Sequence, residues 1–224
     1  MKLFINFTLL LILNSCIGKN DHDARSVNKN IENIKSSLEN QTSDHIRETE
    51  SIDLNKQAEE AKQFCINNKM NTDFTLLIDM SKHSGKARFY IYDFKLKSVI
   101  DSGLVSHGCC SNPWGADGTK TNPTFNNIPE SHCSSLGKYK VGKRGWSNWG
   151  IHVNYKLHGM EKSNSKALSR QIVLHSWNDI SESEVFPAGT PEGWGCPAVS
   201  NNFMTRLDQK LKTMDKPVLL WIYK

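Results

Sequence analysis

The sequence predicts a mainly β fold of the α+β class, a β-sandwich or open barrel with two or three short helices. Short apolar runs suited to strands recur from residue 74 to residue 223, and Gly/Asn-rich connections separate them. Helical spacing of apolar residues occurs only in short stretches. With 224 residues, of which 38% are hydrophobic, the chain can form one domain plus an attached segment. Collagen, coiled coils and polytopic membrane proteins are excluded.

The strands are expected where apolar residues run together or alternate with polar ones. The clearest alternation sets Ile151, Val153, Tyr155 and Leu157 against polar neighbours. The expected strands are 74–80, 88–94, 98–105, 151–157, 172–174 and 218–223. The expected helices are 54–67, with Ala58, Ala61 and Cys65 facing the body, then 165–171, and 200–214, with Ser200 as N-cap. The Gly/Asn/Pro/Cys-rich stretch 106–135 is too long for an inert turn and is expected to be a functional loop.

The N-terminus predicts an export signal at residues 1–16. Lys2 supplies a positive charge, and an apolar stretch from Leu3 to Leu13 is too short for a permanent membrane span. It ends in Leu13-Asn14-Ser15-Cys16, which resembles the lipobox of bacterial lipoproteins. That resemblance implies that Cys16 is lipid-modified and anchors the protein to a membrane in the bacterial cell envelope, outside the cytoplasm. A plain secretory cleavage site is the alternative.

Residues 17–60 are expected to form a flexible polar tether. They hold 6 Lys/Arg against 10 Asp/Glu, a net charge of −4, and no aromatic residue. Residues 61–224 hold 21 against 13, a net charge of +8, and are expected to form the catalytic domain. A basic body favours an anionic partner, although many basic surfaces serve only solubility. An unconstrained N-terminal extension is the alternative to a tether.

Four cysteines pose a choice between disulfides and metal binding. Cys65, Cys109, Cys110 and Cys133 allow three pairings in an oxidising compartment. Because adjacent cysteines are poorly placed to bridge each other, we favour Cys133 bonded to Cys109 or Cys110. The alternative is a metal held among His107, Cys109, Cys110, His132 and Cys133, whose spacing matches no regular zinc pattern.

His175 and Cys196 form the candidate catalytic pair. An apolar strand ends in His175, and Cys196 follows Gly195 in a turn just before a predicted helix. A helix N-terminus and a neighbouring imidazolium both stabilise a thiolate. Backbone N–H groups of Gly195 and Cys196 would supply an oxyanion hole. These are the parts of a thiol acyl-transfer enzyme. The alternative is a structural cysteine beside a core histidine.

The sequence also resembles a known family, the murein L,D-transpeptidase catalytic domains, whose fold is YkuD-like. The resemblance covers about residues 63–224 and depends on the order and spacing of its segments. These segments are Phe74–Asp79 with Arg88–Asp93, Gly103–Gly108, Ser134–Tyr139, Leu157-His158-Gly159, Arg170–His175 and Trp194–Val199.

The resemblance implies an acyl transfer on peptidoglycan stem peptides through a Cys196 thioester. It makes Cys196 the nucleophile and His175 its base, oriented by the backbone carbonyl of Ser176, with Gly195 in the oxyanion hole. His158 is a rival base, but 21 residues separate His175 from Cys196, which is nearer the family interval than 38. We expect His158, Gly159, Trp194 and His107 to bind substrate.

The implied reaction is L,D-transpeptidation or L,D-carboxypeptidase trimming. It requires no metal or organic cofactor, and we expect no nucleic-acid partner. A papain-like hydrolase is disfavoured because its cysteine precedes its histidine in the chain. The alternative from another class is a non-catalytic wall-binding lipoprotein with Cys196 in a structural disulfide.

Overall fold

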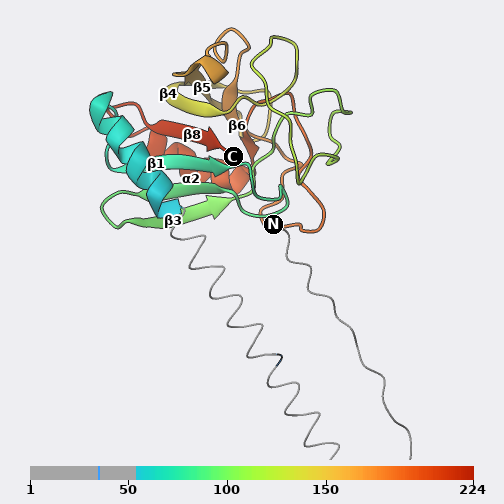
Figure 1. Cartoon of the computed structure of the whole chain (residues 1–224), viewed down its shortest axis with the longest axis horizontal. Coiled ribbons are helices and arrows are strands. Elements are labelled where there is room, and N and C mark those ends of the chain that lie inside the picture. Colours follow the sequence, from blue (N-terminus) through green and yellow to red (C-terminus); the bar gives the residue numbers. More distant parts are fainter. Residues whose placement is uncertain (1–34, 36–53) are drawn as a thin grey trace, which may run out of the picture. The chain divides into compact units, whose positions relative to one another are not determined.

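One eight-stranded sheet forms the body of the protein. The structure is a computed structural model that describes residue 35 and residues 54–224, so the export signal, Cys16 and most of the predicted tether lie outside the described residues. The strands are β1 (Phe74–Asp79), β2 (Phe89–Asp93), β3 (Ser98–Gly103), β4 (Gly137–Trp146), β5 (Val153–Gly159), β6 (Val173–Ser176), β7 (Ala198–Val199) and β8 (Leu219–Tyr223). Their order is β3-β2-β1-β8-β4-β5-β6-β7, which confirms the mainly β prediction (Figure 1).

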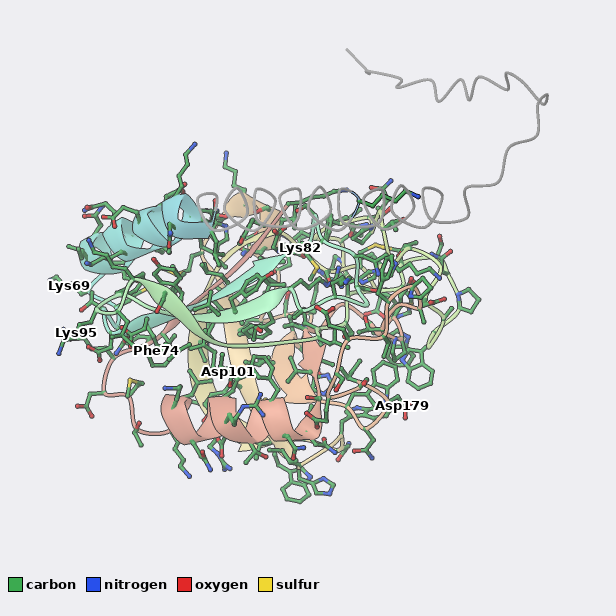
Figure 2. The ribbon with its side chains drawn as sticks, turned by 90° about the horizontal axis from the view of Figure 1, so that it is seen from below. Lys69, Phe74, Lys82, Lys95, Asp101 and Asp179 are labelled. Atoms are coloured by element: carbon green, nitrogen blue, oxygen red, sulfur yellow. A yellow bond between two sulfur atoms is a disulfide. The ribbon has the colours of Figure 1, made fainter. Side chains whose placement is uncertain are left out.

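Two helices cover opposite sides of the sheet (Figure 2). The helix at residues 54–67 buries Ala58, Ala61 and Cys65 against one face, as the sequence predicts. Helix α2 (Asn201–Leu211) packs Phe203 and other apolar side chains against the opposite face. Because β1, β2 and β8 are covered on both sides, they read as continuous apolar runs rather than as alternating patterns.

The helix at residues 54–67 also places residues 54–60 of the predicted tether on the body. Its buried side chains join a core cluster with residues of β1, β2 and β8. Among the helices that the structure describes, none has both the length and the apolar character required to cross a membrane. The tether prediction is therefore restricted to the residues before the helix.

One sequence prediction on secondary structure is wrong, and one strand has no counterpart among those predicted. Residues 165–171 form turns after a short 3₁₀ helix, η1 (Lys162–Asn164), and they end at Gln171 with a φ of 57°. Strand β4 was not predicted because glycines and lysines interrupt its apolar pattern. Its register with β5 also shifts between Val141 and Arg144, so no simple alternation survives.

Candidate active site

Cys196 lies two residues before β7, next to β6, the strand that carries His175. Its Sγ accepts a hydrogen bond from the backbone N–H of Val173 at 3.4 Å. Immediately after Cys196 and Pro197, strand β7 pairs in parallel with β6, so that Ala198 lies opposite His175. This pairing brings the turn with the thiol beside the strand with the imidazole. Cys196 is half-buried and forms no disulfide within the described residues.

The imidazole of His175 is buried and oriented by its own strand. Its Nδ1 lies 2.9 Å from the backbone carbonyl oxygen of Ser176, the contact that the sequence predicts. Because a carbonyl oxygen only accepts, Nδ1 carries the hydrogen and Nε2 is left as a proton acceptor. Burial lowers the pKa of His175, and the bond to Ser176 opposes this change. The ring is therefore neutral at neutral pH, as a general base must be.

Burial acts against the expected thiolate at Cys196. Burial raises the pKa of the Cys196 thiol, while the Val173 N–H group and the positive charge of Arg170 act in the opposite direction. No hydrogen bond joins Cys196 to His175 in the described structure. Burial therefore favours the neutral forms of both side chains.

Helix α2 does not stabilise the thiolate as the sequence suggested. Strand β7 separates Cys196 from the helix, which begins only at Asn201. Glu182 occupies the helix N-terminus: its carboxylate accepts from the N–H of Asn202 at 2.9 Å and from the hydroxyl of Ser200 at 2.6 Å. The positive end of the helix is therefore satisfied by this carboxylate.

Arg170 is a charged residue near the thiol to which the sequence alone assigned no role. Its guanidinium donates hydrogen bonds to the carbonyl oxygens of Asn126 and Cys133 and to the hydroxyl of Ser135, the last at 2.7 Å. Burial lowers the pKa of Arg170, and the nearby Tyr139 and Cys196 raise it. Its place five residues before His175 was visible in the sequence, but nothing there showed that it would turn toward Cys196.

Gly195 is required by backbone geometry as well as by space. Its φ is 96°, a region that L side chains rarely adopt. A Cβ atom at this position would lie 2.5 Å from the carbonyl oxygen of Cys133. No hydrogen bond among the described residues uses the backbone N–H of Gly195 or Cys196. Both N–H groups can therefore still donate, which the predicted oxyanion hole requires.

The cysteines form one disulfide in the described residues, Cys110–Cys133, which confirms the preferred pairing of Cys133 with a member of the adjacent pair. Cys65 and Cys109 are buried free thiols. The bond uses two of the sulfur atoms that the metal alternative required. Within residues 54–224, no group of three or more His, Cys, Asp or Glu side chains is placed to hold a metal ion.

The expectation that His107 binds substrate is wrong. His107 is fully buried and hydrogen bonds with Arg88 at 2.9 Å and with Thr119 at 2.8 Å. Burial and the Arg88 charge lower its pKa to about 3. His107 therefore supports the loop region beneath the surface, and only its position in the sequence had suggested contact with a ligand.

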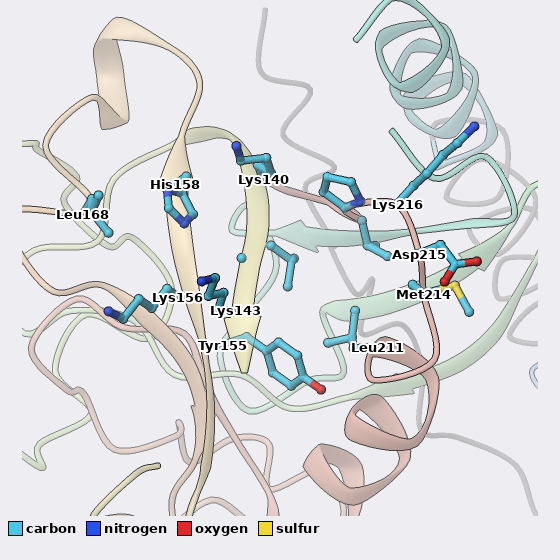
Figure 3. A pocket seen from close by; sticks show the side chains of 14 residues that line it. Lys140, Lys143, Tyr155, Lys156, His158, Leu168, Leu211, Met214, Asp215 and Lys216 are labelled. Atoms are coloured by element: carbon cyan, nitrogen blue, oxygen red, sulfur yellow. The ribbon is translucent and has the colours of Figure 1, made fainter. Parts of the chain in front are cut away.

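The other expected substrate-binding residues lie in three different settings. Trp194 is 62% exposed and stacks on His132, with ring centroids 5.1 Å apart. Gly159 lies against η1, because a Cβ there would meet the Asn164 carbonyl oxygen. His158 lines a pocket of about 580 Å³, which neither Cys196 nor His175 lines (Figure 3).

The pocket at His158 is strongly basic. Lys140, Lys143, Lys156 and Lys216 line it, with Asp215 as its acidic residue. The Lys140 and Lys156 charges contribute to lowering the pKa of His158, after the larger effect of burial. The β5–β6 register sets Asn154 opposite His175, so alternation along β5 places Lys156 and His158 on the same face of the sheet as His175.

Comparison with known proteins identifies the family. The model of the L,D-transpeptidase catalytic domain matches residues 47–223, well over half of the chain. The protein therefore belongs to the L,D-transpeptidase catalytic domain family, as the sequence resemblance predicted. Comparison with curated proteins gave no match.

Solved structures with a similar arrangement are distant in sequence. The Ldtfm–avibactam carbamoyl enzyme is 10% identical, with a TM-score of 0.40 over 68% of this chain and 49% of that one. The helical cell shape determining protein Pgp2 of Campylobacter jejuni is 14% identical, with a TM-score of 0.39 over 68% and 48%. An L,D-transpeptidase from Xylanimonas cellulosilytica is 14% identical, with a TM-score of 0.36 over 72% and 68%. This chain matches about half the length of the first two.

Replacing Arg170 should change the ionisation of Cys196. We expect Arg170→Gln to raise the pH midpoint of Cys196 alkylation by about one unit, because a positive charge that favours the thiolate is lost. The midpoint is measured with iodoacetamide, by mass analysis of the peptide that contains Cys196.

Two variants separate charge from local disruption. Arg170→Lys keeps the charge and should shift the pH midpoint much less than Arg170→Gln does. Lys166→Gln removes a positive charge from an exposed residue of the same turn and should leave the midpoint unchanged. Equal shifts in Arg170→Gln and Lys166→Gln would show that Arg170 has no specific effect on the thiol.

Proposed function

We propose that this protein is a cysteine-dependent acyl transferase that acts on peptidoglycan stem peptides, by L,D-transpeptidation or by L,D-carboxypeptidase trimming. Membership of the L,D-transpeptidase catalytic domain family supports the reaction class. The observation that carries the residue assignment is the bond from His175 Nδ1 to the Ser176 carbonyl, which leaves Nε2 to accept a proton on the strand next to Cys196.

The first step forms a thioester. Cys196 Sγ attacks the carbonyl between an L-centre and a D-centre of the stem while His175 Nε2 takes the thiol proton. The carbonyl oxygen, now negative, accepts hydrogen bonds from the N–H groups of Gly195 and Cys196. When the tetrahedral intermediate collapses, the bond to the departing amine breaks and His175 returns the proton to it.

The second step releases the acyl group. An amine of a neighbouring stem or a water molecule attacks the thioester carbonyl, and His175 accepts its proton. The C–S bond then breaks, and the proton returns to the Cys196 sulfur. An amine gives a cross-link, and water gives a trimmed stem.

A basic pocket on the same face of the sheet as His175 supports an anionic substrate. Lys156 and His158 lie on the same face of β5 and β6 as His175, at the basic pocket. Stem peptides carry carboxylates, which positive side chains attract. The assignment of His158 and Gly159 to substrate binding stays a prediction, and this pocket is where His158 would act.

The alternative of a non-catalytic wall-binding lipoprotein is disfavoured. That hypothesis places Cys196 in a structural disulfide, whereas the described residues pair Cys110 with Cys133 and leave Cys196 free.

The assignment predicts distinct losses on mutation. Cys196→Ala should abolish release of D-alanine from a stem tetrapeptide, and Cys196→Ser should also fail, since an alcohol is almost wholly protonated at neutral pH. His175→Ala should reduce the rate at least about a hundredfold, because the general base is lost. Mass analysis of muropeptides incubated with the purified protein measures all three.

An exposed histidine provides the control. His152 is exposed and has a φ of 62°, so His152→Asn suits its backbone and should keep the wild-type rate. Turnover by Cys196→Ala above background would contradict the assignment, as would equal losses in the His175 and His152 variants.

The proposed cellular place is the bacterial envelope, with the protein tethered through a lipid on Cys16. The support is the Leu13-Asn14-Ser15-Cys16 sequence after an apolar stretch. Mass analysis of the mature protein from native membranes should find an acylated Cys16 at its N-terminus. A soluble mature form without lipid would refute the anchor and leave the catalytic proposal intact.

A further inference from the structure

Three tryptophan side chains, Trp114, Trp149 and Trp177, form an aromatic cluster. The rings of Trp114 and Trp177 stack with centroids 4.9 Å apart and an interplanar angle of 26°. The Trp149 ring lies 6.1 Å from each of the other two. Trp177 is 5% exposed, whereas Trp114 and Trp149 are each 48% exposed. Trp177 is therefore the floor of the tryptophan cluster, and the other two rings present open surface.

Trp177, the floor of this cluster, lies directly after β6, the strand that carries His175. Trp177 follows Ser176 directly, and its backbone N–H donates to the carbonyl of Val199 in β7 at 2.9 Å. A side chain at Gly193, three residues before Cys196, would meet the Trp177 ring at 4.0 Å. The cluster thus lies beside the segments that carry both His175 and Cys196.

The two exposed tryptophans are held by the same segments. The backbone N–H of Ile151, in the Trp149 turn, donates to Ser176 Oγ at 2.9 Å. The N–H of Gly115, next to Trp114, donates to the carbonyl of Glu192 at 2.9 Å. Each loop is therefore fixed to a segment that carries one member of the catalytic pair, the Trp149 turn to β6 and the Trp114 loop to the residues before Cys196.

The chemistry of the cluster fits a sugar ring. A pyranose has an apolar face of C–H groups and a rim of hydroxyls, so it can lie on an indole and hydrogen bond at its edges. Asn178, which follows Trp177, is exposed and neutral, and its Oδ1 already accepts from Asn201 at 3.0 Å, which leaves its N–H groups for a hydroxyl. Open aromatic surface beside a catalytic pair has no use in packing the core.

We propose that the tryptophan cluster binds an amino-sugar ring of the glycan strand that carries the stem peptide. This inference rests on the proposed function, because a stem peptide reaches the site with its glycan attached. It assigns a substrate class: sugar-bearing fragments are bound better than free stem peptides.

Binding of the sugar alone tests the proposal without any catalysis. The full-length protein is titrated with the peptide-free disaccharide of N-acetylglucosamine and N-acetylmuramic acid, and binding is followed by ligand-observed NMR. We expect saturable binding that Trp114→Ala and Trp149→Ala each weaken about fivefold. Trp114→Phe, which keeps an aromatic ring, should retain most of the affinity.

Trp146 provides a matched control for these variants. It is 71% exposed and stacks on His152 instead of joining the cluster. Trp146→Ala should leave the affinity unchanged. The proposal is overturned if the wild-type protein does not bind the disaccharide, or if Trp146→Ala weakens binding as much as the cluster variants do.

A kinetic comparison separates this proposal from the proposed function. Trp149→Ala should raise the KM for a disaccharide tetrapeptide about fivefold and leave the KM for the free tetrapeptide unchanged. An equal rise in KM for both substrates would overturn the glycan assignment and leave the acyl-transfer proposal intact. Disaccharide binding by a protein that transfers no acyl group would sink the catalytic proposal alone.

Discussion

The guanidinium of Arg170 joins the residues before β6 to the loop that contains Asn126, Cys133 and Ser135, next to the Cys196 turn. It binds the carbonyl oxygen of Cys133, and that same oxygen occupies the space where a side chain at Gly195 would stand. The hydroxyl of Ser134 donates to the Gly195 carbonyl at 3.1 Å, which adds a second contact between this loop and the Cys196 turn. One charged group therefore binds the disulfide-linked loop that lies against Gly195 and sets a positive charge near the sulfur.

The electrostatics of the site follow from this enclosure. Burial disfavours charge on both members of the pair, so it lowers the pKa of His175 and raises that of Cys196. His175 consequently remains an unprotonated base to lower pH than a free histidine would. Charge arises only when the proton moves from sulfur to Nε2, and Arg170 and the free amides of the turn are then in position to stabilise negative charge. For the proposed reaction, these directions favour proton transfer during the attack over a thiolate formed beforehand.

Sequence patterns predicted what depends on local periodicity and residue type. The apolar runs of β1 and β8, the buried stripe of α2 and the helix at residues 54–67 are fixed by side chains that face the core. Strand β4 escaped prediction because its pairing with β8 and β5 overrides a glycine- and lysine-rich sequence.

The site was only partly predictable, because several of its contacts join residues that are distant in sequence. The bond between His175 and Ser176 joins neighbouring residues, so a family pattern carries it. The burial of His107 depends on Arg88 and Thr119, and the capping of α2 depends on Glu182. These partners are distant in sequence, so no local sequence pattern indicates them. The helix N-terminus does not act on the thiol as expected, because β7 lies between Cys196 and the helix.

In the proposed reaction, the Cys196 sulfur carries the acyl group during turnover. The most direct measurement is the intact and peptide mass of the protein, quenched in acid after brief mixing with a disaccharide tetrapeptide. The account predicts an adduct equal to the substrate minus D-alanine, on the peptide that contains Cys196, and its absence from the Cys196→Ala variant. Turnover without any adduct, or an adduct on another residue, would contradict the account.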